Sequence, residues 1–241
     1  NSSKKNGSLD DVINALKSKN IKYTVYDGVE ENPSVETVME AREIGVKAGC
    51  DFIIGIGGGS PMDAAKAIGV MIYHKNENKD FLYKSVSNSQ SLPVIEVPTT
   101  CGTGSEVTTV AVLTVHNEKT KKSMSHRIFP RMALVDEKYI KNAPLKVICD
   151  TAIDALAHIV ESCINNNATE YSKMFAKEGL EAWSKFKDVL LGNREATDED
   201  FHNMMYASTL AGMCIAHAGT SLPHGLSYPI TYELGIPHGK A

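Results

Sequence analysis

The sequence has 241 residues, of which 42% are hydrophobic and 22% are charged, and its formal net charge is -4 at pH 7. This composition is ordinary for a globular protein, and the weakly acidic balance excludes an electrostatic footprint for nucleic acid or for an anionic membrane. No apolar run approaches the roughly 20 residues that span a bilayer, and the N-terminus lacks the apolar core of a signal peptide. We therefore expect a cytoplasmic protein without nucleic-acid or membrane partners.

The five cysteines are odd in number and scattered, and no two of them form a C-x-x-C pair. This spacing argues against both a disulfide framework and a thiolate zinc site. The chain opens without methionine and stops at Ala241, directly after a motif that carries chemistry. We therefore expect it to be a piece of a longer protein.

The first part of the chain alternates between helical and strand-like patterns. Ser34 is placed to cap the N-terminus of one helix, and Gly49 to close it. The expected elements are a helix over 9–17, a strand over 22–26, a helix over 35–48, a strand over 51–56, a helix over 61–71, a loop over 73–90, and strands over 93–97, 110–115 and 131–136. Such alternation predicts an α/β fold with a doubly wound parallel sheet.

Beyond Pro144 the strand patterns stop and three helical patterns follow, over 146–165, 169–191 and 198–217. This change predicts an all-helical domain after the α/β domain. We place the boundary so that residues 1–144 form the first domain and residues 145–241 form the second.

A glycine cluster, Gly57, Gly58 and Gly59, lies between an expected strand and an expected helix. Ser60 is placed as the helix N-cap, and Asp63 completes a start that resembles a capping box. Backbone amides at such a helix start favour a phosphate group. The spacing is not G-x-G-x-x-G, so the ordinary dinucleotide fingerprint is absent and a tight turn is the alternative interpretation.

A second loop follows the next strand and contains Thr99, Thr100, Thr103 and Ser105 among glycines. Hydroxyls and free amides at the carboxyl ends of neighbouring strands are typical of a nucleotide site in an open α/β sheet. A simple Ser/Thr-rich turn is the alternative, but two such loops in one sheet favour nucleotide binding.

Four residues predict a metal site in the helical part. Asp154 and His158 are four positions apart and therefore lie on one face of an apolar helix. His224 and His238 each lie in a Pro-His-Gly unit, which we expect to form a rigid turn. One carboxylate and three imidazoles suit Zn²⁺ or Fe²⁺ better than Mg²⁺ or Ca²⁺, whereas a lone buried acid and imidazole could simply satisfy each other. His217, near a helix end, is a weaker candidate that also fits a packing role.

Together, the glycine loop over 57–63, the threonine-rich loop over 98–107, the Asp154/His158 pair and the two Pro-His-Gly units resemble the iron-containing (group III) alcohol dehydrogenases. The resemblance implies a dehydroquinate-synthase-like fold in which the two loops bind NAD or NADP. It implies Fe²⁺, with Zn²⁺ as the alternative, held by the carboxylate and three histidines. It also implies a short-chain alcohol or aldehyde as substrate, and a homodimer in the full-length protein.

Two further residues follow from the same resemblance. Lys122 matches a family lysine near the cofactor. Tyr228 stands where many members have a histidine, so it takes the place of that histidine in the catalytic set and could supply a hydroxyl instead. Two alternatives remain at this point. One is an NAD- and metal-dependent cyclase or lyase of the dehydroquinate-synthase type, and the other is a non-catalytic fragment that binds metal or nucleotide.

Overall fold

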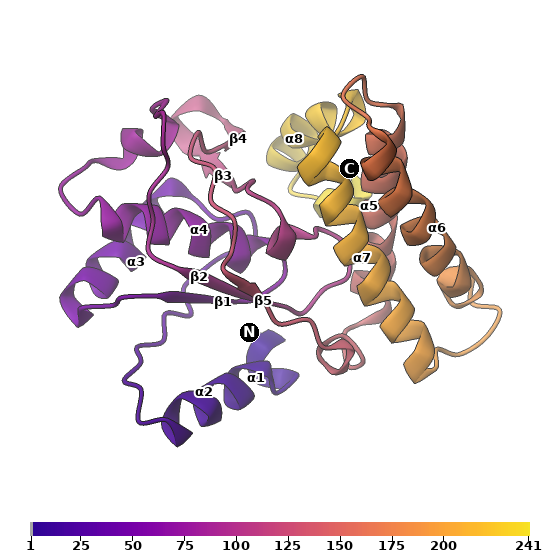
Figure 1. The fold of residues 1–241 in the computed structure, drawn as a ribbon, viewed down its shortest axis with the longest axis horizontal. Helices are drawn as coiled ribbons and strands as arrows, with labels where there is room; N and C mark the ends of the chain where they lie inside the picture. The colour runs from indigo at the N-terminus through magenta and orange to yellow at the C-terminus, as the bar shows by residue number, and fades with distance from the viewer. Residues whose placement is uncertain (1) are drawn as a thin grey trace.

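The computed structural model describes residues 2–241, which form an α/β half followed by an all-helical half (Figure 1). The prediction of this fold class is therefore confirmed. The helices are α1 (Ser2–Lys5), α2 (Ser8–Ser18), α3 (Val35–Ala48), α4 (Gly59–Tyr73), α5 (Leu145–Ile164), α6 (Glu170–Leu190), α7 (Asp198–Ala218) and α8 (Leu222–Leu234). The strands are β1 (Ile53–Gly57), β2 (Val94–Pro98), β3 (Val112–Val115), β4 (Thr120–Ser123) and β5 (Met132–Ala133). Short 3-10 helices are η1 (Lys79–Tyr83), η2 (Ser105–Val107), η3 (His116–Glu118), η4 (Glu137–Tyr139) and η5 (His238–Lys240).

The main sheet is parallel, and its strand order is β1-β2-β5. β1 and β2 pair in register from Ile53 opposite Val94 to Gly57 opposite Pro98. The glycine cluster follows β1 and the threonine-rich loop follows β2, so both loops leave the sheet at the same edge. This edge is where open parallel sheets place their ligands.

Helices α3 and α4 lie on one side of the sheet, and α1 and α2 lie on the other (Figure 1). Small residues of α4 allow it to approach the sheet closely: a Cβ atom on Gly55 of β1 would lie 2.8 Å from the Cβ of Ala65. At the start of α3 the Ser34 side chain accepts a hydrogen bond from the Thr37 amide, and Gly49 ends the helix with φ at 68°. Both predicted caps of α3 are confirmed.

The predicted strand over 22–26 is wrong. These residues pair with no strand, although their alternating apolar side chains fit one. They line one cavity together with β1, whose edge opposite β2 is also unpaired among the described residues. A strand needs a neighbour to satisfy its backbone groups, and a sequence pattern cannot show whether that neighbour is in place.

Two other predicted strands differ from their expected form. The strand expected over 110–115 becomes β3, which pairs antiparallel with β4 in a separate hairpin rather than in the main sheet. The strand expected over 131–136 is reduced to the two residues of β5. In both cases the apolar pattern identified extended chain, but tertiary pairing determined which part became a strand.

The helical half is built on α5, α6 and α7, whose inward faces form one core (Figure 1). Both α6 and α7 begin with a capping box, at Thr169 with Ser172 and at Thr197 with Asp200. α8 was not predicted. Among residues 2–241, no helix is long and apolar enough to cross a membrane.

The capping residue Asp200 supports a prediction about acid stability. Its buried carboxylate accepts two hydrogen bonds from Arg194, at 2.6 and 2.7 Å, and these hold the pKa of Asp200 well below its usual range. Because the folded pKa is lowered, this stabilisation is complete above the ordinary aspartate range, shrinks as the pH falls below that range, and is lost only when the pH falls through the lowered pKa. We expect Asp200→Asn to lower the free energy of unfolding by roughly 1 to 2 kcal/mol at neutral pH, since the partly exposed guanidinium limits the gain.

Urea denaturation at neutral and acidic pH would measure this effect. The difference between the variant and the wild type should narrow once the pH falls below the ordinary aspartate range. Glu170→Gln is the matched control, because Glu170 is 91% exposed in its pair with Lys173 and should contribute nothing measurable. A loss in Asp200→Asn that is the same at both pH values would contradict the prediction.

Candidate metal centre and cofactor cleft

The helix α5 carries Asp154 and His158 on one buried face. Asp154 and His158 are each about 5% exposed, and they lie one turn apart. Their Oδ1 and Nε2 atoms are 3.8 Å from each other. The helical spacing that was read from the sequence therefore brings both groups to one buried position.

The other two histidines come from the C-terminal end of the chain. His224 lies in the first turn of α8, whose early proline, Pro223, fits a helix start. The expectation of a rigid turn at His224 is therefore wrong, because Pro-His-Gly here begins a helix. His238 begins η5, directly after Pro237, so a turn is present at the second unit.

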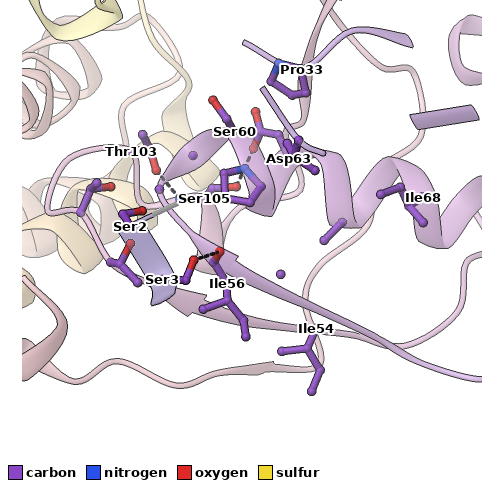
Figure 2. A pocket seen from close by; sticks show the side chains of 18 of the residues that line it. Ser2, Ser3, Pro33, Ile54, Ile56, Ser60, Asp63, Ile68, Thr103 and Ser105 are labelled. Carbon is purple, nitrogen blue, oxygen red and sulfur yellow. Dashed lines mark hydrogen bonds between the residues drawn. The ribbon is translucent and has the colours of Figure 1, made fainter. Parts of the chain in front are cut away.

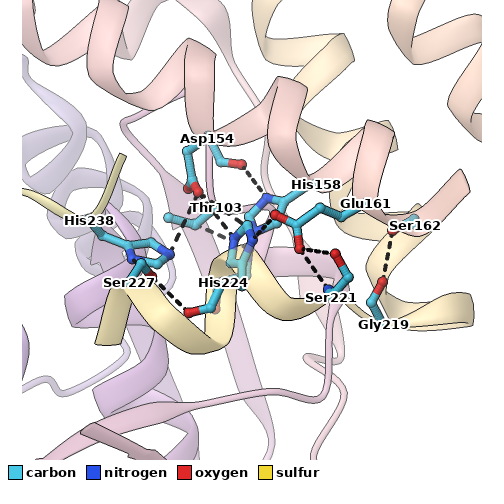
Figure 3. Close-up of polar contacts among 12 residues, drawn as sticks. Thr103, Asp154, His158, Glu161, Ser162, Gly219, Ser221, His224, Ser227 and His238 are labelled. Carbon is cyan, nitrogen blue, oxygen red and sulfur yellow. Dashed lines mark hydrogen bonds and ion pairs between the residues drawn. The ribbon is translucent and has the colours of Figure 1, made fainter. Parts of the chain in front are cut away.

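All three imidazoles point a ring nitrogen at the Asp154 carboxylate (Figure 3). The Nε2 atoms of His224 and His238 lie 3.5 and 3.7 Å from Asp154 Oδ1. Asp154, His224 and His238 offer atoms that are all within 4.8 Å of one another and could hold a metal ion. His158 is outside this group of three, but its ring stacks on His224 with centroids 4.5 Å apart.

The second nitrogen of each ring has its own partner. His158 Nδ1 is 3.2 Å from the Gly102 carbonyl oxygen, and His224 Nδ1 is 2.6 Å from Glu161 Oε1. His238 Nδ1 is 3.2 Å from Ser227 Oγ, whose hydrogen is already donated to the His224 carbonyl. Because these partners accept, each Nδ1 donates its hydrogen, and the neutral ring then presents an unprotonated Nε2.

These four side chains therefore form a cluster of hydrogen-bond acceptors that has no hydrogen-bond donor at its centre. Asp154 Oδ1 faces three Nε2 lone pairs, and His224 Nε2 is buried without a hydrogen-bond partner. Burial would raise the pKa of Asp154, but the surrounding histidines outweigh it and lower the pKa to about 2. Buried acceptors without donors are costly, and a cation would satisfy all of them together.

Burial also shifts the pKa values of the imidazoles. It lowers the pKa of His158, and it lowers that of His238 to about 4. For His224 burial acts in the same direction, but the negative charges of Asp154 and Glu161 beside the ring outweigh it and raise the pKa. His158 and His238 are therefore neutral at neutral pH, with an unprotonated ring nitrogen that can bind a metal ion.

On the other side of the cleft the glycine cluster packs tightly against the threonine-rich loop. A Cβ atom on Gly58 would lie 3.1 Å from the Thr100 side chain, and one on Gly59 would lie 2.8 Å from Thr103. Gly57 has φ at 147°, which side-chain-bearing residues rarely adopt. The close approach of the two loops therefore favours glycine at positions 58 and 59, and the backbone conformation favours it at position 57.

The start of α4 differs from its prediction. Gly58, not Ser60, is the N-cap, and no side chain caps the helix. Ser60 lies inside the first turn, and its hydroxyl accepts a hydrogen bond from the Asn32 amide. Asp63 does not form the predicted capping box, because its two oxygens accept from Ser105 Oγ at 2.6 Å and from the Val112 amide at 2.8 Å (Figure 2). Its carboxylate instead fastens the threonine-rich loop to α4.

One cleft of about 2050 Å³ connects the two sides. Its lining includes Gly58, Gly59, Ser60, Thr99, Thr100, Thr103, Asp154, His158, His224, Tyr228 and His238. Ser60 and Thr103 are labelled on its wall in Figure 2. The structure therefore brings both predicted loops and all four predicted metal ligands to a single cavity.

The prediction for Lys122 needs correction. On β4, neighbouring side chains point to opposite faces, and it is Lys121 that lines the cleft and donates to Asn32 Oδ1 at 2.8 Å. Lys122 pairs with Glu118 at 3.3 Å and lies over the Tyr83 ring. Tyr228 does line the cleft, with its ring centroid 5.8 Å from that of His238 and 5.5 Å from Lys121 Nζ.

His217 is not among the residues that line the cleft, and it stacks on Phe175 with centroids 5.6 Å apart, which fits a packing role. The sequence reading missed Glu161, Ser227 and Lys121. Glu161 had a usable signal, because it follows Asp154 by seven positions and so shares its helix face. Ser227 gave no such signal, since its role depends on how α8 folds back toward η5.

Comparisons with known proteins agree with this geometry. The model of the iron-containing alcohol dehydrogenase family matches residues 1–137, and that of the family's C-terminal part matches residues 148–241. The long-chain primary alcohol dehydrogenase AdhA of Thermoanaerobacter ethanolicus is 32% identical over 98% of this chain and 60% of its own length. The 1,3-propanediol dehydrogenase of Citrobacter freundii is 33% identical, over 98% of this chain and 61% of its own.

Solved structures show the same relation. An iron-containing alcohol dehydrogenase from Thermotoga maritima superposes with a TM-score of 0.93 and 42% identity, covering 100% of this chain and 66% of its own. A sulfoacetaldehyde reductase from Bifidobacterium kashiwanohense, solved in complex with NAD⁺, superposes with a TM-score of 0.87 and 30% identity, covering 99% of this chain and 63% of its own. The chain spans about 60% of the length of the curated relatives named above. The family models cover both halves of the chain, and it belongs to the iron-containing alcohol dehydrogenase family.

Proposed function

We propose that this chain is the cofactor- and metal-binding part of an oxidoreductase that transfers a hydride between NAD or NADP and a short-chain alcohol or aldehyde. The observation that carries the proposal is the shared cleft. It is lined both by the buried candidate metal ligands and by the glycine cluster and the threonine-rich loop. Residues 1–144 would then hold the dinucleotide, and residues 145–241 would hold the metal. By resemblance to the family, the full-length protein would be a homodimer.

The residues present fit a divalent ion. Asp154, His158, His224 and His238 would be its ligands, and one carboxylate with three imidazoles suits Fe²⁺ or Zn²⁺. The unpartnered Nε2 of His224 supports this, since a buried acceptor without a donor is otherwise unexplained. When bound, such an ion would supply Lewis acidity at the substrate oxygen.

The residues present also fit a dinucleotide. α4 begins without a side-chain cap, so its first amides are free for a phosphate. The hydroxyls of Thr99 and Thr100 are buried without a hydrogen-bond partner and belong to the cleft wall. Gly57, Gly58, Gly59, Ser60 and Thr103 complete the cradle, and we assign to the loops the role of orienting the dinucleotide toward the ligand cluster.

We assign Tyr228 a hydrogen-bonding role toward the substrate oxygen. Burial, together with Asp63 and Asp154, raises the pKa of Tyr228 to about 12. The hydroxyl therefore keeps its proton at neutral pH and can donate it in a hydrogen bond. This replaces the histidine that many family members have at this position.

The names of relatives support an alcohol or aldehyde as substrate without selecting one. They include 1,3-propanediol dehydrogenases, a lactaldehyde reductase of Escherichia coli and an NADPH-dependent butanol dehydrogenase of Clostridium saccharobutylicum. The shared class is an oxidoreductase acting on an alcohol or aldehyde group.

Oxidation of NADH or NADPH, followed at 340 nm with a panel of short aldehydes and added Fe²⁺ or Zn²⁺, tests the proposal. Turnover should require aldehyde and metal, and His224→Ala should abolish it. Binding of metal and dinucleotide without turnover would support the non-catalytic alternative. Absence of both binding and turnover would contradict the proposed function.

We assign to Lys121, which lines the cleft, the contact with the dinucleotide that was expected of Lys122. A matched lysine pair tests this assignment. Lys121→Met should raise the dissociation constant for NADH or NADPH by about 10-fold or more, since a charge contact of roughly 1.5 to 3 kcal/mol is lost. Lys122→Met should leave it unchanged, because Lys122 pairs with Glu118 outside the cleft. Quenching of dinucleotide fluorescence would measure both. Equal effects of the two substitutions would contradict the assignment.

A further inference from the structure

Glu161 is a buried carboxylate that contacts the ligand cluster without belonging to it. It follows Asp154 and His158 along one face of α5 and is 4% exposed. Its Oε1 atom accepts a hydrogen bond from His224 Nδ1 at 2.6 Å (Figure 3). One helix therefore presents two ligand candidates and, a turn further on, the group that holds a third.

The other oxygen of Glu161 is also engaged. Oε2 accepts from the Ser221 amide at 2.6 Å and from Ser221 Oγ at 2.8 Å. Ser221 directly precedes α8, so the carboxylate lies at the positive end of the helix that carries His224. Because both oxygens accept hydrogen bonds, the carboxylate is held in one orientation. The carboxylate in turn fixes the orientation of the His224 ring.

The three imidazoles differ in what their Nδ1–H group meets. For His158 the partner is a backbone carbonyl, and for His238 it is a serine hydroxyl. Of the three Nδ1–H groups, only that of His224 donates to a carboxylate. A carboxylate behind an imidazole fixes its tautomer and raises the basicity of the far nitrogen. The far nitrogen of His224 is the one that is buried without a partner.

The charge of the ligand cluster also supports a role for Glu161. Asp154 is the single anion among the four ligand candidates, and a buried divalent ion is poorly compensated by one carboxylate. We infer that Glu161 is a positioning residue, which orients His224 Nε2 toward a divalent cation and supplies a second negative charge beside the ligands. This inference rests on the proposed metal centre and concerns a residue outside its ligand set.

The test is the affinity of the 241-residue chain for Co²⁺ alone, measured by competition with a chromophoric chelator. Glu161→Gln should raise the dissociation constant by about 10- to 100-fold, the usual cost of losing an outer-shell partner of a metal ligand. The visible absorption spectrum of bound Co²⁺ should also change, because one imidazole is no longer held in place. Melting of the metal-free protein should change little by comparison.

Ser221→Ala is the matched control. It removes one donor to Glu161 Oε2 and leaves the contact between Glu161 and His224 intact. Because the Ser221 amide still donates to Oε2 and keeps the carboxylate in place, we expect a Co²⁺ affinity and spectrum close to those of the wild type. Any cost should fall on the melting temperature of the metal-free protein, since one hydrogen bond between Ser221 and Glu161 is lost while the Ser221 side chain makes no cap bond to α8.

Three outcomes distinguish the positioning role of Glu161 from a purely structural role and from the absence of a metal centre. Wild-type affinity and spectrum in Glu161→Gln would overturn the inference and leave the metal centre standing. A lower melting temperature of metal-free Glu161→Gln, with unchanged Co²⁺ affinity, would reduce Glu161 to a helix cap and also overturn it. Failure of the wild-type chain to bind Co²⁺ would contradict the metal centre itself and, with it, this role.

Discussion

Asp154→Asn is expected to lower metal-dependent turnover by more than about 100-fold, the upper end of the cost of losing even an outer-shell partner of a metal ligand. Asp154 Oδ1 is the atom from which the three Nε2 atoms lie 3.5 to 3.8 Å, so it is the centre of the cluster. Asparagine keeps the size of the side chain but removes its charge. Its amide group could also donate a hydrogen bond to one Nε2 atom and so block it.

The kinetic constants for aldehyde reduction and the metal content per chain would measure this effect together. Both should fall in parallel. Asp188→Asn is the matched control, because Asp188 is exposed on α6 and bonds only to Asn193. If Asp154→Asn retained both its metal and its activity, Asp154 could not be a ligand.

Gly104→Ala is expected to destabilise the fold by roughly 2 to 5 kcal/mol, the sum of a left-handed backbone and an overpacked contact. Gly104 has φ at 57°, and a Cβ atom there would lie 2.4 Å from the Cα of Gly212 on α7. Backbone faces backbone at this contact, so no side chain can move aside. The same loop carries Thr99, Thr100 and Thr103, and we therefore expect dinucleotide binding to weaken as well.

Urea denaturation of the two variants Gly104→Ala and Gly225→Ala would test this directly. Gly225 lies within α8, and a Cβ atom there meets nothing within 4 Å. Alanine should therefore be neutral at position 225, or stabilising by up to about 1 kcal/mol through its higher helix propensity. Similar stability of the two variants would refute the tight contact between the threonine-rich loop and α7.

Local patterns predicted the parts of this fold that depend on one segment. The apolar face of α5, the cap at Ser34 and the closing glycine of α3 are determined by spacing and by backbone chemistry within a few residues. The strand over 22–26 failed because a strand also depends on a neighbour. α8 was missed because Gly225 and Pro229 look like breaks, although both lie within the helix.

In the candidate site, too, the features that depend on one segment were predicted and those that depend on several segments were not. Asp154 and His158 follow from helical spacing, and the two Pro-His-Gly units identify the remaining imidazoles. The partners of the rings come from three separate places, at Gly102, Glu161 and Ser227, and only the folded chain brings them together. The choice between Lys121 and Lys122 depends on which face of β4 is turned toward the cleft, and the sequence pattern of β4 does not show this.

X-ray absorption at the zinc edge, on protein loaded with Zn²⁺ under anaerobic conditions, tests most directly whether these four residues form one metal centre. We predict about one ion per chain, bound by nitrogen and oxygen with the outer-shell scattering of histidine rings, and loss of this signal in Asp154→Asn. A spectrum dominated by sulfur, or no stoichiometric binding, would contradict the proposed centre.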